Sequence, residues 1–144
     1  MWIYKGQSIT DISQIPENVY GFIYKITRSS DGKFYVGRKN LYSERTKPLT
    51  KKELSEQTGK GRKPTKKKVV SESDWQAYYG SNATLKADIK LTGKEDLVRE
   101  IIHLCTHKKQ MTYQELRHQF LNGCLESDNC WNDNILGKFW RKDI

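Results

Sequence analysis

The sequence of this chain predicts an α+β fold, in which a small, mainly antiparallel three-stranded sheet is flanked by helices. Two patterns carry the prediction. Residues 20–37 contain two runs of aromatic and β-branched residues around a turn cluster, as a β-hairpin does. Residues 81–93 and 112–123 carry apolar residues at helical spacing between a capping residue and a glycine. A length of 144 residues suits one domain, which we expect to span residues 1–144.

The hairpin is the most clearly marked element. Its first strand places four side chains on one face at period two: Tyr20, Phe22, Tyr24 and Ile26. The second strand covers residues 33–37, and residues 29–32, Ser-Ser-Asp-Gly, form the turn between them. An even loop places Tyr24 and Tyr35 on the same face, whereas an odd loop would separate them. The four residues of the turn favour the even register.

The remaining elements are less clearly marked. Residues 2–4 could form a short edge strand, and residues 40–46 a helical turn or two. Thr50 and Glu53 fit the capping box of a short helix over residues 51–57. We expect a short helix over 74–80, while periodicity alone leaves 97–105 open between strand and helix. The tail is expected to pack through its apolar residues Trp131, Ile135, Leu136, Phe139 and Trp140.

Charge is distributed unevenly along the chain. Lys and Arg number 26 against 17 Asp and Glu, a net charge of +9. Residues 46–70 hold nine of the positive and two of the negative charges, which leaves +7 for that segment alone. We expect a basic insertion at about residues 46–74, with a flexible loop outside its short helix. Such a charge indicates a polyanionic partner, with nucleic acid ahead of an anionic membrane. The candidate DNA-binding residues are Lys39, Lys60, Arg62, Lys63, Lys66, Lys67 and Lys68.

Other classes of protein are excluded by composition. No apolar run is long enough to cross a bilayer, and the N-terminus lacks the layout of a secretory signal. The three cysteines form no C-x-x-C pair, which fits a reducing compartment, and we expect a cytoplasmic protein. A zinc site can be assembled from Cys124, Cys130, His118 and His107, but its spacings match no finger or ribbon.

Several residues have the chemistry that a nuclease needs. Such an enzyme activates water, holds a divalent cation and stabilises charge on the phosphate. The hairpin supplies two phenols, three basic residues follow it, and a carboxylate begins a predicted helix: Tyr24, Tyr35, Arg38, Lys39, Arg45 and Glu115. Each also has a structural explanation. The tyrosines are common strand residues, Arg45 could be a solvated side chain, and Thr112-x-x-Glu115 is itself a capping box.

The order of these residues resembles the GIY-YIG nuclease superfamily. Gly21-Phe22-Ile23-Tyr24 and Tyr35-Val36-Gly37 stand eleven residues apart, like the paired signature of that family. The first motif carries the extra residue Phe22, and the second has Val36 in place of isoleucine. The resemblance extends over roughly residues 20–135. It implies that residues 97–104 form the third strand of the sheet.

The resemblance also implies the site residues. Arg45, eight residues after Gly37, stands at the position of the family's catalytic arginine, and Arg38 at one that repair enzymes often give to lysine. Glu115 matches the metal-binding glutamate, and Asn132 the late asparagine. The family's histidine or tyrosine, about four residues past the arginine, is Leu49 here. Its role could pass to Tyr78 or Tyr79, or be absent from this chain.

A metal-dependent DNA endonuclease is the function that the resemblance implies. Glu115 would bind one Mg²⁺ or Mn²⁺, and Arg45 would clamp the scissile phosphate. Tyr24 or Tyr35 would deprotonate or orient the attacking water, with a pKa lowered from about 10 by three neighbouring cations, Arg38, Lys39 and Arg45. Asn132 would position Glu115 or close the fold.

Two other functions remain open from the sequence. The chain could be a DNA-binding protein of the same fold that does not cut. It could instead be a protein-interaction module that uses Trp75, Trp131 and Trp140. The resemblance suggests a stand-alone, phage or homing-endonuclease-like enzyme. We expect DNA as its partner and no association with a membrane. The enzyme could be a monomer or a homodimer.

Overall fold

The computed structural model describes residues 1–59 and 61–144, which form two compact units. The first unit comprises Met1–Leu41 and Asp74–Ile144, and the second comprises Tyr42–Ser73. Lys60, one of the expected DNA-binding residues, lies outside the described part of the chain. No described helix is long and apolar enough to cross a membrane.

The first unit is built on a five-stranded sheet in the order β2-β1-β7-β3-β4. The strands are β1 (Trp2–Tyr4), β2 (Gln7–Ile9), β3 (Gly21–Arg28), β4 (Phe34–Asn40) and β7 (Leu97–Cys105). All neighbours are antiparallel except β1 and β7, which are parallel. The α+β class is therefore confirmed, and the three predicted strands are joined by two more. The segment expected at the edge, β1, lies inside the sheet because β2 folds back against it.

The hairpin has the register that its turn length predicts. Tyr24 pairs with Gly37 and Ile26 with Tyr35, so the two phenols lie on the same face of the sheet. Their ring centroids are 6.1 Å apart. Gly32, with φ of 73°, supplies the left-handed residue of the turn.

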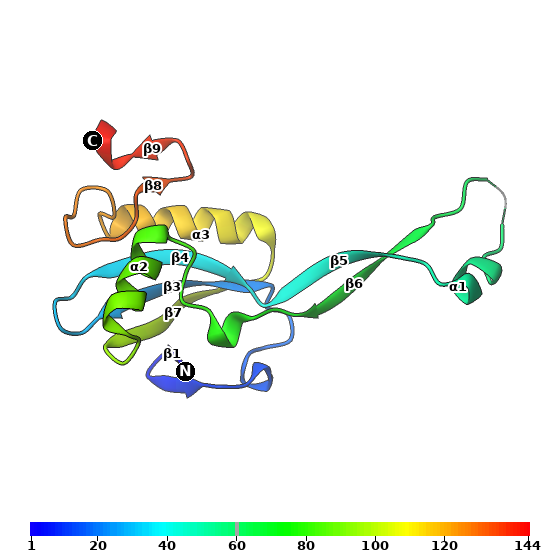
Figure 1. Ribbon diagram of the computed structural model, residues 1–144, viewed down its shortest axis with the longest axis horizontal. Coiled ribbons are helices and arrows are strands. Elements are labelled where there is room, and N and C mark those ends of the chain that lie inside the picture. The colour runs from blue at the N-terminus through cyan, green and yellow to red at the C-terminus, as the bar shows by residue number, and fades with distance from the viewer. Residues whose placement is uncertain (60) are drawn as a thin grey trace. The chain divides into compact units, whose positions relative to one another are not determined.

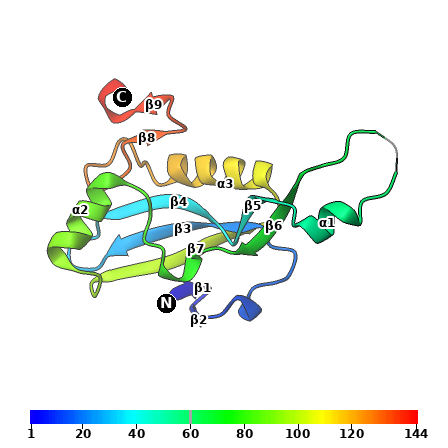
Figure 2. The same ribbon diagram turned by 45° about the vertical axis from the view of Figure 1, so that its right-hand side comes forward.

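Helices cover both faces of this sheet (Figures 1 and 2). On one face, α3 (Lys108–Leu121) packs over a cluster that includes Ile23, Val36 and Met111. On the other, α2 (Ala83–Thr92) and a 3-10 turn at Trp75–Ala77 cover a cluster that includes Tyr24. The helix predicted over 74–80 is thus a single 3-10 turn.

The helix α3 begins earlier than the sequence predicts. Its N-cap is His107, whose Nδ1 accepts a hydrogen bond from the Gln110 amide at 3.3 Å. The Gln110 side chain reaches back to the amide of Thr106 at 2.7 Å. The helix start expected at Thr112 is therefore wrong, because these residues cap the helix one turn sooner. Glu115 lies inside the helix and is not part of a capping box.

The second unit, called here the basic unit (residues 42–73), is a two-stranded ribbon of β5 (Tyr42–Pro48) and β6 (Lys66–Glu72) with the short helix α1 (Lys51–Ser55). The capping box of Thr50 and Glu53 is confirmed. The helical turn expected over 40–46 is wrong, and so is the flexible loop over 66–70. In both cases pairing with a distant strand, which local propensity does not record, decides the structure.

The tail follows α3 as β8 (Asn134–Ile135), β9 (Phe139–Trp140) and a 3-10 turn at Arg141–Asp143. Trp131 and Ile135 are buried as expected. Leu136, Phe139 and Trp140 are instead 51%, 49% and 41% exposed, so the tail packs through only part of its apolar set.

Candidate active site

A pocket of about 360 Å³ lies beside β4, the edge strand of the sheet. It brings together five residues that the sequence singles out: Tyr24, Tyr35, Arg38, Glu115 and Asn132. They come from β3, β4, α3 and the segment after α3, which lie up to 108 residues apart in sequence. All belong to the first unit.

The edge position of β4 explains how side chains from both faces of the sheet reach one pocket. Tyr24 and Tyr35 lie on the α2 face. Arg38 follows Gly37, so its side chain starts on the α3 face, where Glu115 also lies. Because β4 is the last strand of the sheet in the described part of the chain, the two faces meet around its edge.

The glycines of both motifs are required by close contacts. A β-carbon at Gly37 would lie 2.6 Å from the Tyr24 hydroxyl and 2.9 Å from Cε1 of Tyr35. A β-carbon at Gly21 would lie 2.7 Å from the Met111 sulfur on α3. The lack of a β-carbon at Gly37 lets both phenols pack against β4. The lack of one at Gly21 lets α3 approach the sheet.

Burial raises the pKa of both phenols of the pocket. It raises the pKa of Tyr35 to about 12, although a hydrogen bond with Ser81 acts in the opposite direction. The pKa of Tyr24 is raised well above 10 by burial first, and also by Tyr35, Tyr78 and Glu115. The lowering expected from nearby cations is therefore wrong.

Lys39, one of those expected cations, has another role. Its Nζ lies 2.6 Å from Oδ1 of Asp74 and 4.1 Å from the centroid of the Tyr78 ring. Asp74 thus offsets the charge of Lys39. Lys39 is not among the described residues that line the pocket.

Glu115 and Arg38 form the charged pair of the pocket. Nε of Arg38 lies 3.7 Å from Oε1 of Glu115, and its Nη1 donates to the Thr112 hydroxyl at 2.8 Å. Burial raises the pKa of Glu115, and the Coulombic attraction of Arg38 offsets part of that rise. The ion pair is long, so neither group fully satisfies the other.

Asn132 closes the open edge of β4. Its Oδ1 accepts from the Val36 amide at 3.0 Å, and its Nδ2 donates to the Val36 carbonyl at 2.9 Å. The preceding residues pair with Phe34 through backbone bonds at 3.0 and 2.8 Å. The amide of Asn132 therefore continues the pairing of the edge and holds β4 in place. The structure records no bond from Asn132 to Glu115 among the described residues.

The pocket also contains residues that the sequence reasoning missed. They are Ser81, Asn82, Gln119, Asp133, Asn134 and Leu136. Gln119 is 6% exposed and donates to the Val36 carbonyl at 3.1 Å, while its Oε1 is buried with no protein partner in the described chain. It stands four residues after Glu115, the spacing that places two side chains on one helix face. That spacing was available from the sequence, because the helix predicted over residues 112–123 already contains both Glu115 and Gln119.

The other expected residues lie elsewhere. Tyr78 contacts Tyr24, with ring centroids 6.0 Å apart, whereas Tyr79 packs against the guanidinium of Arg99. Arg45 lies on β5 of the basic unit, opposite Val69, and is thus outside the unit that forms the pocket. The remaining candidates of the basic unit are Arg62, Lys63, Lys66, Lys67 and Lys68, of which Lys67 pairs with Glu53 at 2.8 Å.

The zinc alternative finds no support in the described residues. No group of three or more metal-binding side chains is gathered there, and the cysteines are buried. His107 instead serves as the cap of α3.

Comparison with known families identifies the family of this chain. The family model described as "Putative endonuclease segE, GIY-YIG domain" matches residues 2–136, which include both motifs, Glu115 and Asn132. Searches of curated proteins and of solved structures found no match to this chain. Because the family match covers most of the sequence, this protein belongs to the GIY-YIG endonuclease family.

Proposed function

We propose that this protein is a divalent-metal-dependent DNA endonuclease whose active site is the pocket beside β4. Membership of an endonuclease family implies DNA as the substrate. The observation that carries the assignment of the site is the convergence of two phenols, one guanidinium and the partly buried carboxylate of Glu115 in a single pocket. The hairpin of β3 and β4 is local, whereas α3 and the segment that carries Asn132 reach the pocket only through the tertiary fold.

The donor set of the pocket fits a hard divalent cation. Mg²⁺ and Mn²⁺ prefer oxygen ligands and retain several waters. Glu115 would hold the metal, since ionic attraction to a cation offsets the cost of burying its charge. The partnerless Oε1 of Gln119, on the same helix face, offers a second oxygen. When bound, the cation withdraws charge from the phosphate and the leaving oxygen.

Arg38 is the arginine that the pocket itself offers to a phosphate. Its side chain is 38% exposed and is held by Thr112 and, loosely, by Glu115. A planar guanidinium can donate to two phosphate oxygens at once. We assign phosphate binding to Arg38, while the family position Arg45 remains a prediction for the basic unit.

The phenols would orient water without losing their protons. Hydrolysis adds a water oxygen to phosphorus and breaks one bond from phosphorus to a deoxyribose oxygen. Tyr24 and Tyr35 stay protonated, so each can donate to the water or to the phosphate. We assign acceptance of the water proton to Asp133, the pocket's second carboxylate, which is held by Asn82 at 3.1 Å.

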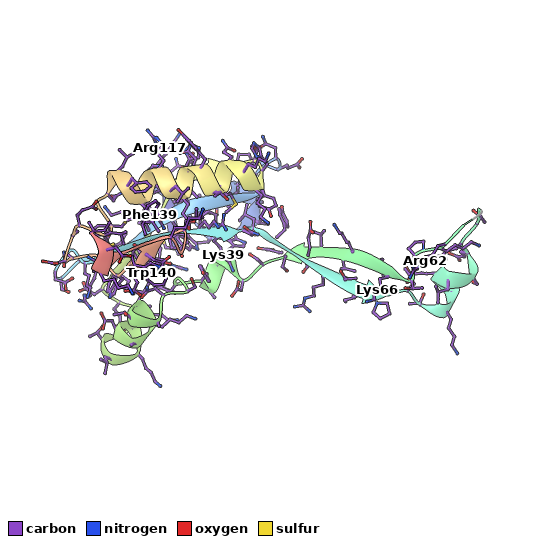
Figure 3. The ribbon with its side chains drawn as sticks, turned by 90° about the horizontal axis from the view of Figure 1, so that it is seen from above. Lys39, Arg62, Lys66, Arg117, Phe139 and Trp140 are labelled. Atoms are coloured by element: carbon purple, nitrogen blue, oxygen red, sulfur yellow. The ribbon has the colours of Figure 1, made fainter. Side chains whose placement is uncertain are left out.

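The basic unit would supply affinity for the DNA backbone. Lys66 and Lys68 lie on one face of its ribbon, and Lys47 and Lys67 on the other. Figure 3 shows Arg62 and Lys66 on this unit. Lysines neutralise phosphates with little regard to base sequence.

A plasmid-nicking assay tests this function. Wild type should nick supercoiled DNA in Mg²⁺ or Mn²⁺, and chelation should stop it. Glu115→Gln should bind DNA but not cut, while the matched change at the exposed Glu17, outside the pocket, should leave cutting unchanged. Asp133→Asn should lower kcat while keeping metal binding. Cutting by Glu115→Gln at the wild-type rate would contradict the site.

The two alternative functions give different results. A binding protein that does not cut would hold DNA but leave every plasmid intact with either metal. An interaction module built on Trp75, Trp131 and Trp140 is disfavoured, since Trp75 and Trp131 are 0% and 2% exposed.

A further inference from the structure

The turn between β8 and β9 presents a leucine in an unfavourable backbone conformation. Leu136 and Gly137 have φ of 59° and 64°, and the amide of Lys138 donates to the Ile135 carbonyl at 3.1 Å. Two successive left-handed residues are typical of a type I′ hairpin turn, where Asn-Gly is preferred. Leucine is a poor choice for this conformation, because its β-carbon crowds the backbone.

The surrounding contacts hold this turn in place. Oδ1 of Asn134 accepts from the Gly137 amide at 2.8 Å, and Ile135 beside it is 1% exposed. The guanidinium of Arg141 donates to five backbone carbonyls of the preceding segment: Cys124, Leu125, Ser127, Cys130 and Asn132. A costly conformation that is so firmly held points to a function for the residue that adopts it.

Leu136 stands at the pocket of the proposed active site. It is 51% exposed and is the one aliphatic side chain among the described lining residues, which are otherwise tyrosine, charged or polar. An occupant that offers an apolar surface next to its charge would complement this lining. A DNA strand does so, because a sugar and a base adjoin each phosphate.

The rest of the hairpin has the same character. Phe139 and Trp140, on β9, are 49% and 41% exposed and appear on the face that Figure 3 views. Lys138, also exposed, adds a positive charge next to the turn. Exposed apolar groups beside a cation suit the surface of a nucleic acid, where bases lie behind phosphates.

We propose that Leu136 packs between the bases adjoining the cut phosphate and opens that base step. The inference rests on the proposed function, since it places the DNA strand in the same pocket. Leucine is among the side chains that proteins insert as apolar wedges into a duplex. Separating the bases would let the phosphate reach the bottom of the pocket.

The test uses Leu136→Asn, which suits the left-handed conformation better than leucine. A merely structural role predicts an equal or higher Tm and wild-type cutting. Our proposal predicts an equal or higher Tm together with a loss of cutting on the order of tenfold or more. Leu136→Met, which keeps an apolar reach, should retain most of the activity. Leu91→Asn, at a leucine that is 83% exposed on α2 and outside the pocket, is the matched control.

A second measurement does not depend on cutting. With the cut site mapped from nicked plasmid, a duplex carrying 2-aminopurine beside the cut reports unstacking by its fluorescence. Binding of Glu115→Gln should raise the fluorescence, and Glu115→Gln combined with Leu136→Asn should not.

The outcomes separate this inference from the proposed function. Wild-type cutting together with unchanged cutting by Leu136→Asn would overturn the role of Leu136 alone. Failure of wild type to cut any DNA would overturn the proposed function, and this inference with it.

Discussion

The hydroxyl of Tyr24 lies over Gly37, at a position where a β-carbon on the glycine would come within 2.6 Å of the oxygen. The tyrosine of the first motif thus requires the glycine of the second. Because the hairpin register places these two residues opposite each other, the motifs are one packing unit and not two separate sites.

We expect Gly37→Ala to displace both phenols. The added methyl group would clash with Tyr24 and Tyr35, and overpacking of this kind costs about 1–3 kcal/mol. The rate of plasmid nicking should fall as well, because the phenols leave their positions in the pocket. Denaturant unfolding and the plasmid assay measure the two effects. In a double-mutant cycle with Tyr24→Phe, part of the cost should disappear; strict additivity would contradict the contact.

Tyr35 should ionise late in an alkaline titration. Burial raises its pKa to about 12, so the absorbance of its phenolate should appear only as the pH approaches that value. The difference between wild type and Tyr35→Phe isolates this phenol among eight tyrosines. If the titration step that Tyr35→Phe lacks has its midpoint near the ordinary pKa of about 10, the pocket leaves Tyr35 exposed to water.

Glu115→Gln should stabilise the protein at neutral pH. The pKa of the folded carboxyl is raised above its ordinary 4.5, so the unfolded chain loses this proton first. Folding stability therefore falls as the pH rises from about 4.5 to the folded pKa, and the loss remains above it. The gain in folding stability from Glu115→Gln should be present at pH 7. It should vanish at a pH below the carboxyl pKa of the unfolded chain, about 4.5. Unfolding by urea at acidic and neutral pH measures it.

Divalent metal should reverse this difference. At 100 times its Kd, a ligand of the folded state adds about 2.7 kcal/mol to stability. Mg²⁺ or Mn²⁺ should raise the Tm of wild type and leave that of Glu115→Gln unchanged. An equal rise in both proteins would place the metal away from Glu115.

Asn132→Ala should weaken the edge of the sheet. It leaves the buried amide of Val36 without its partner and removes one of two donors to the Val36 carbonyl. A buried polar group without a partner costs about 1–3 kcal/mol. The midpoint of denaturant unfolding should fall accordingly, while DNA affinity persists. Unchanged stability with lost cutting would instead assign Asn132 a direct role in the reaction.

Neutralising the basic unit should flatten the salt dependence of DNA binding. Lys66→Gln with Lys68→Gln removes two charges from one face of the ribbon without deleting part of β6. If both contact phosphates, the slope of log K against log salt should fall by about 2. The control removes the same charge at Lys5 and Lys90, in the first unit. An equal change in both double variants would show that the basic unit is not a specific phosphate contact.

Much of the fold could be predicted because its signals are local. The alternation of Tyr20 to Ile26 and the four-residue turn together determined the hairpin and its register. Gly93, with φ of 83°, ends α2 as the pattern indicates. Where a distant partner decides the structure, local reasoning failed. The helical turn predicted over residues 40–46 is replaced by strand pairing between β5 and β6. The early start of α3 has a local cause instead, the cap formed by His107 and Gln110, which the pattern at Thr112 concealed.

The candidate site, too, was predictable only in part. The sequence by itself determined which residue types are present, their order along the chain and the concentration of charge in one segment. Only the tertiary structure decided that Asn132 bonds Val36, 96 residues away, that Gln119 and Leu136 share the pocket with Glu115, and that Lys39 faces Asp74. It also decided how far the pKa values of the two tyrosines are raised. Their pKa values depend on how much water burial removes, and burial is set by segments far apart in the sequence.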